Sequence, residues 1–245
     1  MIAALLSLAL LAKVPAGMVP IPAGAYHPLF AMRNAPTRVA AFAVDRAPVT
    51  RGEFLIFVRA NPAWRRSAIK PSLAGASYLS DWPSDLDAGN RTSRDQPVRN
   101  VSWFAARAYC AARGKRLPTT DEWEYVAAAD EKRRDATSDP AFIQRLIAMY
   151  TNHRGGFRNV YGVDDLHADG WEWTADFNSA MSAMSAGDSM ARGDGAHGGH
   201  HDLGCAGAAL GAADPSNYPA FLRSAVRAGL TRQSATSHLG FRCAM

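Results

Sequence analysis

Sulfur and imidazole side chains gather in one low-complexity stretch, residues 178–204, and in the cysteine that follows it. Thioether, imidazole and thiolate ligands together favour copper, and Cu(I) prefers the sulfur atoms. The ligands in question are Met181, Met184, Met190, His197, His200, His201 and Cys205. This pattern predicts a copper site in an inserted loop, with Cys205 as the candidate reactive thiol. The open alternatives are a surface loop that binds nothing and a Cys205 that forms an intermolecular disulfide.

The N-terminus and the cysteine count together favour export. The first twelve residues are an unbroken apolar run, which is typical of the core of a signal peptide, although no positive charge precedes it. We predict that residues 1–17 are a signal peptide and that the protein is periplasmic or secreted; the alternative is a buried N-terminal helix. An exported chain with three cysteines can form one disulfide and keep one further thiol.

Composition limits the remaining function classes. The chain has 245 residues, 48% of them hydrophobic and 20% charged, which is typical of a globular protein. Beyond the N-terminal run, no apolar stretch approaches the roughly 20 residues of a membrane span. The net charge of +5 comes from short, scattered basic clusters, so we expect a solvated basic surface and no nucleic-acid binding.

Helix signals stand between segments of short strands and turns. Thr50 and Glu53 form one capping box, and Thr119 and Glu122 form a second. With the caps and stops around them, these patterns predict helices from 51 to 60, 103 to 113, 120 to 129 and 140 to 149. Residues 63–100 read as a long structured loop, and turns and short strands are expected after Thr151. The predicted fold class is α+β with few helices and much irregular structure.

The order of several short motifs resembles the formylglycine-generating enzyme (sulfatase-modifying factor) family. The motifs are Val101–Trp103, Gly114–Thr119, Glu122–Tyr125, Asn159–Gly162, Trp171–Thr174 and Leu239–Arg242. They span nearly the whole chain after residue 18. The resemblance implies one domain over residues 18–245, with a compact fold related to C-type lectin-like domains and with Arg223 and Arg227 in its C-terminal strands.

The resemblance also assigns structural roles. Cys110 and Cys243 occupy positions that resemble a family disulfide between the central helix and the last strand. The signature tryptophans and arginines are read as core anchors and as partners of loop carbonyls and carboxylates, because buried aromatics dominate the core of an irregular fold. They are Trp103, Trp123, Trp171, Trp173, Arg116, Arg227 and Arg242.

The family reaction and its metals are only partly supported by this sequence. Family members oxidise a cysteine in a Cys-x-Pro-x-Arg segment with O2 and a Cu(I) held by two cysteines near the C-terminus. No cysteine lies between Ala206 and Arg242, so that thiolate pair is absent. The resemblance further implies a calcium site, in which Asp169 and Glu172 match the family positions.

The sequence leaves three functional interpretations open. The first is an exported, noncatalytic or divergent accessory or maturation factor that binds a protein partner, an exported enzyme or a metal. The second is a copper- and O2-dependent oxidase of the formylglycine-generating type, built from Cys205 and the loop histidines. The third is a lectin-like binding module without turnover.

Overall fold

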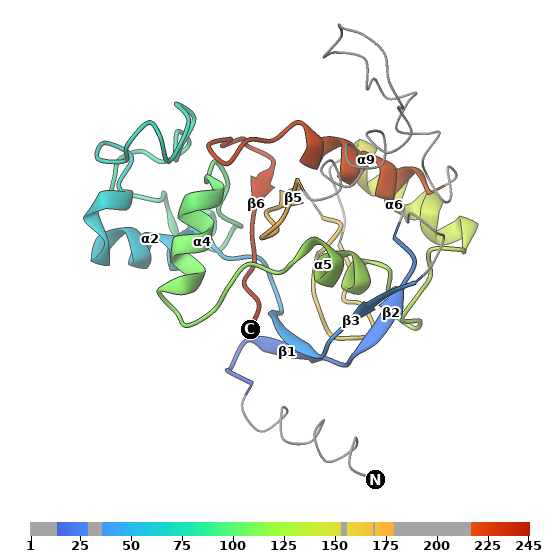
Figure 1. The fold of residues 1–245 in the computed structure, drawn as a ribbon. Helices are drawn as coiled ribbons and strands as arrows, with labels where there is room; N and C mark the ends of the chain where they lie inside the picture. The colour runs from blue at the N-terminus through green and yellow to red at the C-terminus, as the bar shows by residue number, and fades with distance from the viewer. Residues whose placement is uncertain (1–13, 29–35, 153–155, 169, 179–216) are drawn as a thin grey trace, which may run out of the picture.

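The computed structural model describes residues 14–28, 36–152, 156–168, 170–178 and 217–245 (Figure 1). Its helices are α2 (Arg51–Ala60), α3 (Arg91–Arg94), α4 (Trp103–Ala111), α5 (Thr120–Ala127), α6 (Pro140–Asn152) and α9 (Tyr218–Ala228), with a 3-10 turn η1 at Pro62–Trp64. Its strands are β1 (Met18–Ile21), β2 (Gly24–Tyr26), β3 (Thr37–Val39), β4 (Phe42–Asp45), β5 (Trp171–Glu172) and β6 (Leu239–Gly240). Short strands among loops confirm the predicted α+β class.

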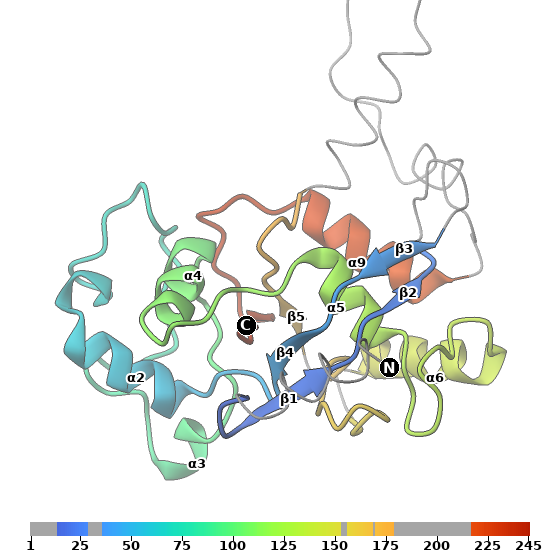
Figure 2. The same ribbon diagram turned by 60° about the horizontal axis from the view of Figure 1, so that its bottom comes forward.

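The strands form three two-stranded sheets. β1 pairs with β4 and β2 with β3, both antiparallel. β5 and β6 pair in parallel, although the 66 residues 173–238 lie between them in the sequence. In both views α2 and α4 lie on the left, β2 and β3 lie on the right, and β1 lies between them (Figures 1 and 2). Such small sheets cannot form the core alone, so side-chain clusters must connect the elements.

The predicted capping boxes fix where two helices begin. The Thr50 hydroxyl accepts a hydrogen bond from the Glu53 amide, and the Glu53 carboxylate accepts one from the Thr50 amide, which starts α2. Thr119 and Glu122 exchange the same bonds at the start of α5. Each box satisfies two backbone donors that a helix otherwise leaves unpaired. In the part of the chain that is described, no helix is long and apolar enough to cross a membrane.

Two main hydrophobic clusters divide the core. The larger one joins α2 and α4 to the loop at 74–101 and to the C-terminal strand, around the fully buried Phe54, Trp173 and Phe241. The second joins β1, β3 and β4 to α5 through Trp123 and Val126. The C-terminal segment contributes to both clusters and therefore holds them together.

Backbone hydrogen bonds show how this segment joins the rest. Asp45 donates to the carbonyl of Cys243, Ala43 and Met245 exchange two hydrogen bonds, and Ala244 exchanges two with Arg116. The Arg116 guanidinium also binds Glu122, with both N–O distances at 2.6 Å. Thus the end of the chain lies between β4 and the link from α4 to α5 (Figure 2).

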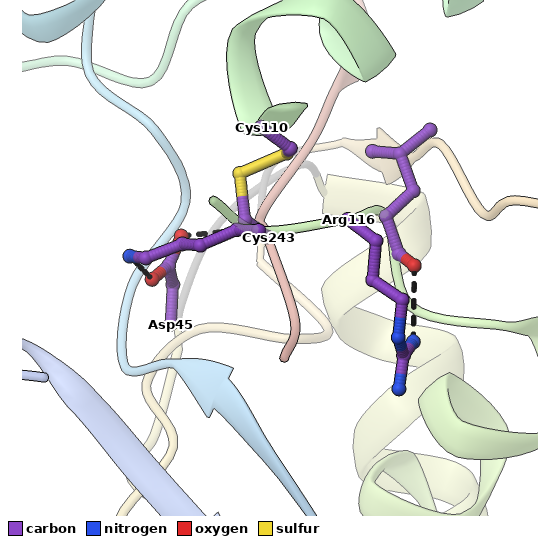
Figure 3. Close-up of a disulfide and its surroundings, with 6 residues drawn as sticks. Asp45, Cys110, Arg116 and Cys243 are labelled. Atoms are coloured by element: carbon purple, nitrogen blue, oxygen red, sulfur yellow. Dashed lines mark hydrogen bonds and ion pairs between the residues drawn. A yellow bond between two sulfur atoms is a disulfide. The ribbon is translucent and has the colours of Figure 1, made fainter. Parts of the chain in front are cut away.

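A disulfide between Cys110 of α4 and Cys243 closes the same junction, as the family resemblance implied (Figure 3). Both cysteines are fully buried, and 133 positions separate them in the sequence. Asp45 accepts a hydrogen bond from the Cys243 amide and pairs with Lys115 at 2.6 Å. The covalent link and the ion pair therefore restrain the same short segment.

Removing this disulfide should destabilise the protein strongly. Because the bridge closes a long loop, the chain-entropy model assigns it about 4–5 kcal/mol, and engineered cases often give less. A Cys110→Ser/Cys243→Ser variant should therefore lose about 3–5 kcal/mol of unfolding free energy in urea. Reductant should shift the wild-type midpoint towards that of the variant and leave the variant unchanged. A wild-type midpoint that reductant does not move would contradict a stabilising bridge.

Candidate functional site

A cavity of about 390 Å³ opens between the start of α2, the loop before β5 and the loop before β6. Charged side chains of both signs and one histidine line it: Arg51, Asp81, Arg99, Asp165, Glu172 and His238. A concave site with a few converging charged groups is the usual place for a small ligand or a cation. Glu172, from the sequence motif Trp171–Thr174, therefore lies in the wall of a cavity.

Glu172 is the most buried acid in the wall of this cavity. Its carboxylate accepts two hydrogen bonds from Arg242, at 2.7 and 2.8 Å, and one from the Trp123 indole at 2.9 Å. The Arg242 and Glu172 side chains are 0% and 3% exposed, so each buried charge requires the opposite charge of the other to compensate it. Glu172 thus anchors the fold. Asp169, its predicted calcium partner, lies outside the described residues, and the calcium site stays a prediction.

Asp165 is a cavity residue that the sequence reasoning missed. Burial and the neighbouring Asp164 carboxylate raise the pKa of Asp165. Arg158 pairs with Asp164, and Arg242 pairs with Glu172, whereas no described residue donates a hydrogen bond to the Asp165 carboxylate. The signal available in the sequence was the adjacent acidic pair shortly before Trp171. A carboxylate that lines a cavity and has no hydrogen-bond donor among the described residues suits a bound cation.

A second charged cluster lies where α5, α6 and α9 meet. The Arg223 guanidinium donates to the Glu124 carboxylate, with the shortest distance 2.6 Å from Nη2 to Oε2. Arg227 donates from Nη1 to the other oxygen, Oε1, at 2.5 Å. Burial alone would raise the pKa of Glu124, but the two guanidiniums outweigh it and lower that pKa to about 2. Both guanidiniums also lie over the Trp123 ring, at 5.6 and 5.1 Å.

The expectation that Arg223 and Arg227 lie in strands was wrong. Both belong to α9, which begins after the Asn217 cap, whose side chain accepts from the Ala220 amide. The two arginines are four residues apart, so a helix places them on one face, and both are buried there against Glu124. A charged buried face does not show the apolar period that marks an ordinary amphipathic helix.

His167 extends this cluster through a chain of hydrogen bonds. Its Nε2 lies 2.9 Å from the Ala127 carbonyl, which can only accept, so Nε2 carries the proton. Nδ1 is then the acceptor, and the Tyr150 hydroxyl donates to it at 2.8 Å while accepting from Arg223. Tyr150 also packs against Trp171, with ring centroids 5.1 Å apart. The neutral histidine is therefore required for this connection between α5 and α6.

The predicted copper ligands cannot be placed in this framework. Met181, Met184, Met190, His197, His200, His201 and Cys205 all lie outside the described residues. Among the residues that are described, no group of three or more His, Cys, Asp and Glu side chains could hold a metal. The disulfide uses two of the three cysteines, so one chain cannot supply a pair of thiolates. The donor set does not fit the two-thiolate copper site that the resemblance implied.

Acid should destabilise the protein through His167. Burial and Arg223 lower its pKa to about 3, against about 6.5 in an unfolded chain. Because the unfolded state binds the proton first, the stabilisation is complete above pH 6.5 and falls by about 1.4 kcal/mol per pH unit below it. Urea unfolding between pH 6.5 and 5 should show this slope, in a range where Glu124 stays ionised.

Two variants separate His167 from the other histidines. His167→Gln keeps a donor for the Ala127 carbonyl and should lose the slope, whereas His27→Gln, at an exposed residue, should retain it. If His167→Gln does not fold, the NMR titration of the His167 ring in the wild-type protein decides directly. A ring that titrates near pH 6.5 would refute the argument.

Comparisons with known proteins agree with the motif order. Residues 11–245 match the family model described as the sulfatase-modifying factor enzyme 1-like domain. The chain is 33% identical to inactive C-alpha-formylglycine-generating enzyme 2 of Bos taurus, over 66% of this chain and 54% of that protein. It is 30% identical to the Mus musculus protein of the same name, over 84% and 75% of the two chains.

A relative named as an active enzyme is also similar. Formylglycine-generating enzyme of Bos taurus is 27% identical over 94% of this chain and 75% of that protein. The family match covers the cavity, the α5–α9 cluster and the disulfide. The chain therefore belongs to the sulfatase-modifying factor enzyme 1-like family, as a divergent member of it.

Proposed function

We propose that this protein is a noncatalytic member of its family that acts as an exported accessory or maturation factor and binds a protein partner. The observation that carries the proposal is the thiol count. Two of the three cysteines form the buried disulfide, so only Cys205 remains for chemistry. Cu(I) bound by a pair of thiolates within one chain would require a second free cysteine.

Two further observations support a binding role. The relatives of Bos taurus and Mus musculus with at least 30% identity carry the word inactive in their names. Among the described residues, the strongly buried charges are paired. Glu124 binds Arg223 and Arg227, and Glu172 binds Arg242. Such pairs hold elements together and are poor candidates for proton transfer.

The decisive assay offers the protein a peptide containing a Cys-x-Pro-x-Arg segment, with Cu(I) and O2. We expect no aldehyde, because the pair of thiolates is lacking. Mass spectrometry detects the loss of the cysteine thiol, and a catalytically active family member run in parallel controls for the peptide. Aldehyde formation at the rate of that control would overturn the proposal. Aldehyde that disappears in Cys205→Ser would instead establish the oxidase built on Cys205.

Calcium is the cofactor that we propose for the cavity, with Asp165 as a ligand. Asp165 is an exposed residue that lines the cavity and receives no hydrogen bond from the described residues, and Glu172 lies in the same wall. Calcium prefers carboxylate and carbonyl oxygens in flexible arrangements. A bound calcium ion would neutralise the Asp165 carboxylate and so stabilise the loop before β5.

Calcium should therefore raise the melting temperature, and Asp165 should be needed for the effect. At a calcium concentration one hundred times the Kd, linkage gives about 2.7 kcal/mol of stabilisation. Asp165→Asn should remove the shift, whereas Asp95→Asn, at an exposed residue that ends α3, should keep it. Differential scanning fluorimetry with calcium and magnesium checks this, and an equal shift in wild type and Asp165→Asn would exclude Asp165 as a ligand.

A further inference from the structure

Two arginines from different parts of the chain lie over one tryptophan ring. The guanidinium carbons of Arg107 and Arg232 lie 5.3 and 5.2 Å from the centroid of the Trp103 ring. Both arginines are exposed, whereas Trp103 is only 8% exposed. The ring is thus a buried platform that holds two positive charges at the surface.

The backbone fixes both arginines relative to the ring. Trp103 is the first residue of α4, and Arg107 follows four residues later, so both lie on one face of the helix. The Trp103 amide donates to the Arg232 carbonyl at 3.1 Å, which holds the loop after α9 against the start of α4. The indole donates to the Thr174 carbonyl and so cannot turn away. The arrangement is built into the fold.

No carboxylate neutralises this pair within the described part of the chain. Neither Arg107 nor Arg232 makes an ion pair there, in contrast to Arg116, Arg223, Arg227 and Arg242. The sequence explains the difference, because residues 54–80, 96–120 and 215–245 contain no Asp or Glu at all. These three stretches meet at the pair: Gly75 donates to the Gln233 carbonyl, and Gln233 to the Ser72 carbonyl.

We infer that the surface formed by Trp103, Arg107 and Arg232, here called the arginine platform, binds an acidic segment of a partner protein. A guanidinium over an aromatic ring keeps its N–H edge available for a carboxylate. Because each guanidinium carbon lies within 5.3 Å of the same ring centroid, the two positive charges repel each other, and an acidic segment that binds both relieves this repulsion. The inference deepens the proposed binding role by giving the partner a chemistry.

The test uses the full chain and a fluorescein-labelled poly-L-glutamate of about 20 residues as the probe, with anisotropy as the readout at low salt, where screening is weak. Arg107→Gln/Arg232→Gln should weaken binding at least tenfold. The matched control is Arg38→Gln/Arg134→Gln, which removes the same net charge at two exposed residues elsewhere, one of them over the Tyr161 ring. The control should change affinity less than twofold.

Each other outcome would overturn the inference. Equal losses in the two double variants would show that net charge alone attracts the peptide, and no binding by the wild type would remove the acidic partner. Displacement of the peptide by submillimolar inorganic sulfate, against chloride at equal ionic strength, would identify a small-anion site instead. Melting temperatures of both variants confirm that they fold. Aldehyde formation is measured separately, so a failure of the noncatalytic proposal is distinguishable from a failure here.

Discussion

The buried ion pair between Glu172 and Arg242 is the interaction on which the rest of the structure depends. Arg242 saturates the carboxylate from one side, and its remaining N–H groups donate to the carbonyls of Asp45, Arg46 and Asp164. One side chain therefore connects the end of β4, the loop before β5, β5 itself and the C-terminal strand. Losing one partner of a pair this buried leaves an uncompensated charge, at a cost of about 3–5 kcal/mol.

Trp123 joins this pair to the second charged cluster. Its indole N–H donates to Glu172, while Arg223 and Arg227 lie over its ring and bind Glu124 one residue further along α5. The two clusters therefore share one aromatic residue, and α9 is attached to the same framework as the C-terminal strand. With sheets of only two strands, these polar contacts and the disulfide take the place that ladder hydrogen bonds have in a regular β protein.

The range of each interaction along the chain decides whether the sequence predicts it. Thr50 and Thr119 were recognised as helix starts because a capping box lies within four residues, and the structure confirms both. The partners of Glu124 lie 99 and 103 residues away in the sequence, and no local sequence pattern predicts such contacts. His167 was missed for the same reason, since its hydrogen bonds reach Tyr150 and Ala127. α9 was missed because its buried face carries arginines, which a hydrophobic period cannot detect.

The same framework explains how the family fold can persist without a pair of free thiolates. The contacts that hold it involve carboxylates, guanidiniums, indoles and the Cys110–Cys243 bridge, and none of them uses a pair of free thiolates. The fold therefore does not depend on such a pair. The exposed arginines over Trp103 belong to other elements than the charged clusters around Glu124 and Glu172, so that surface can change without disturbing the clusters. A stable framework with separable surfaces is what a binding role requires.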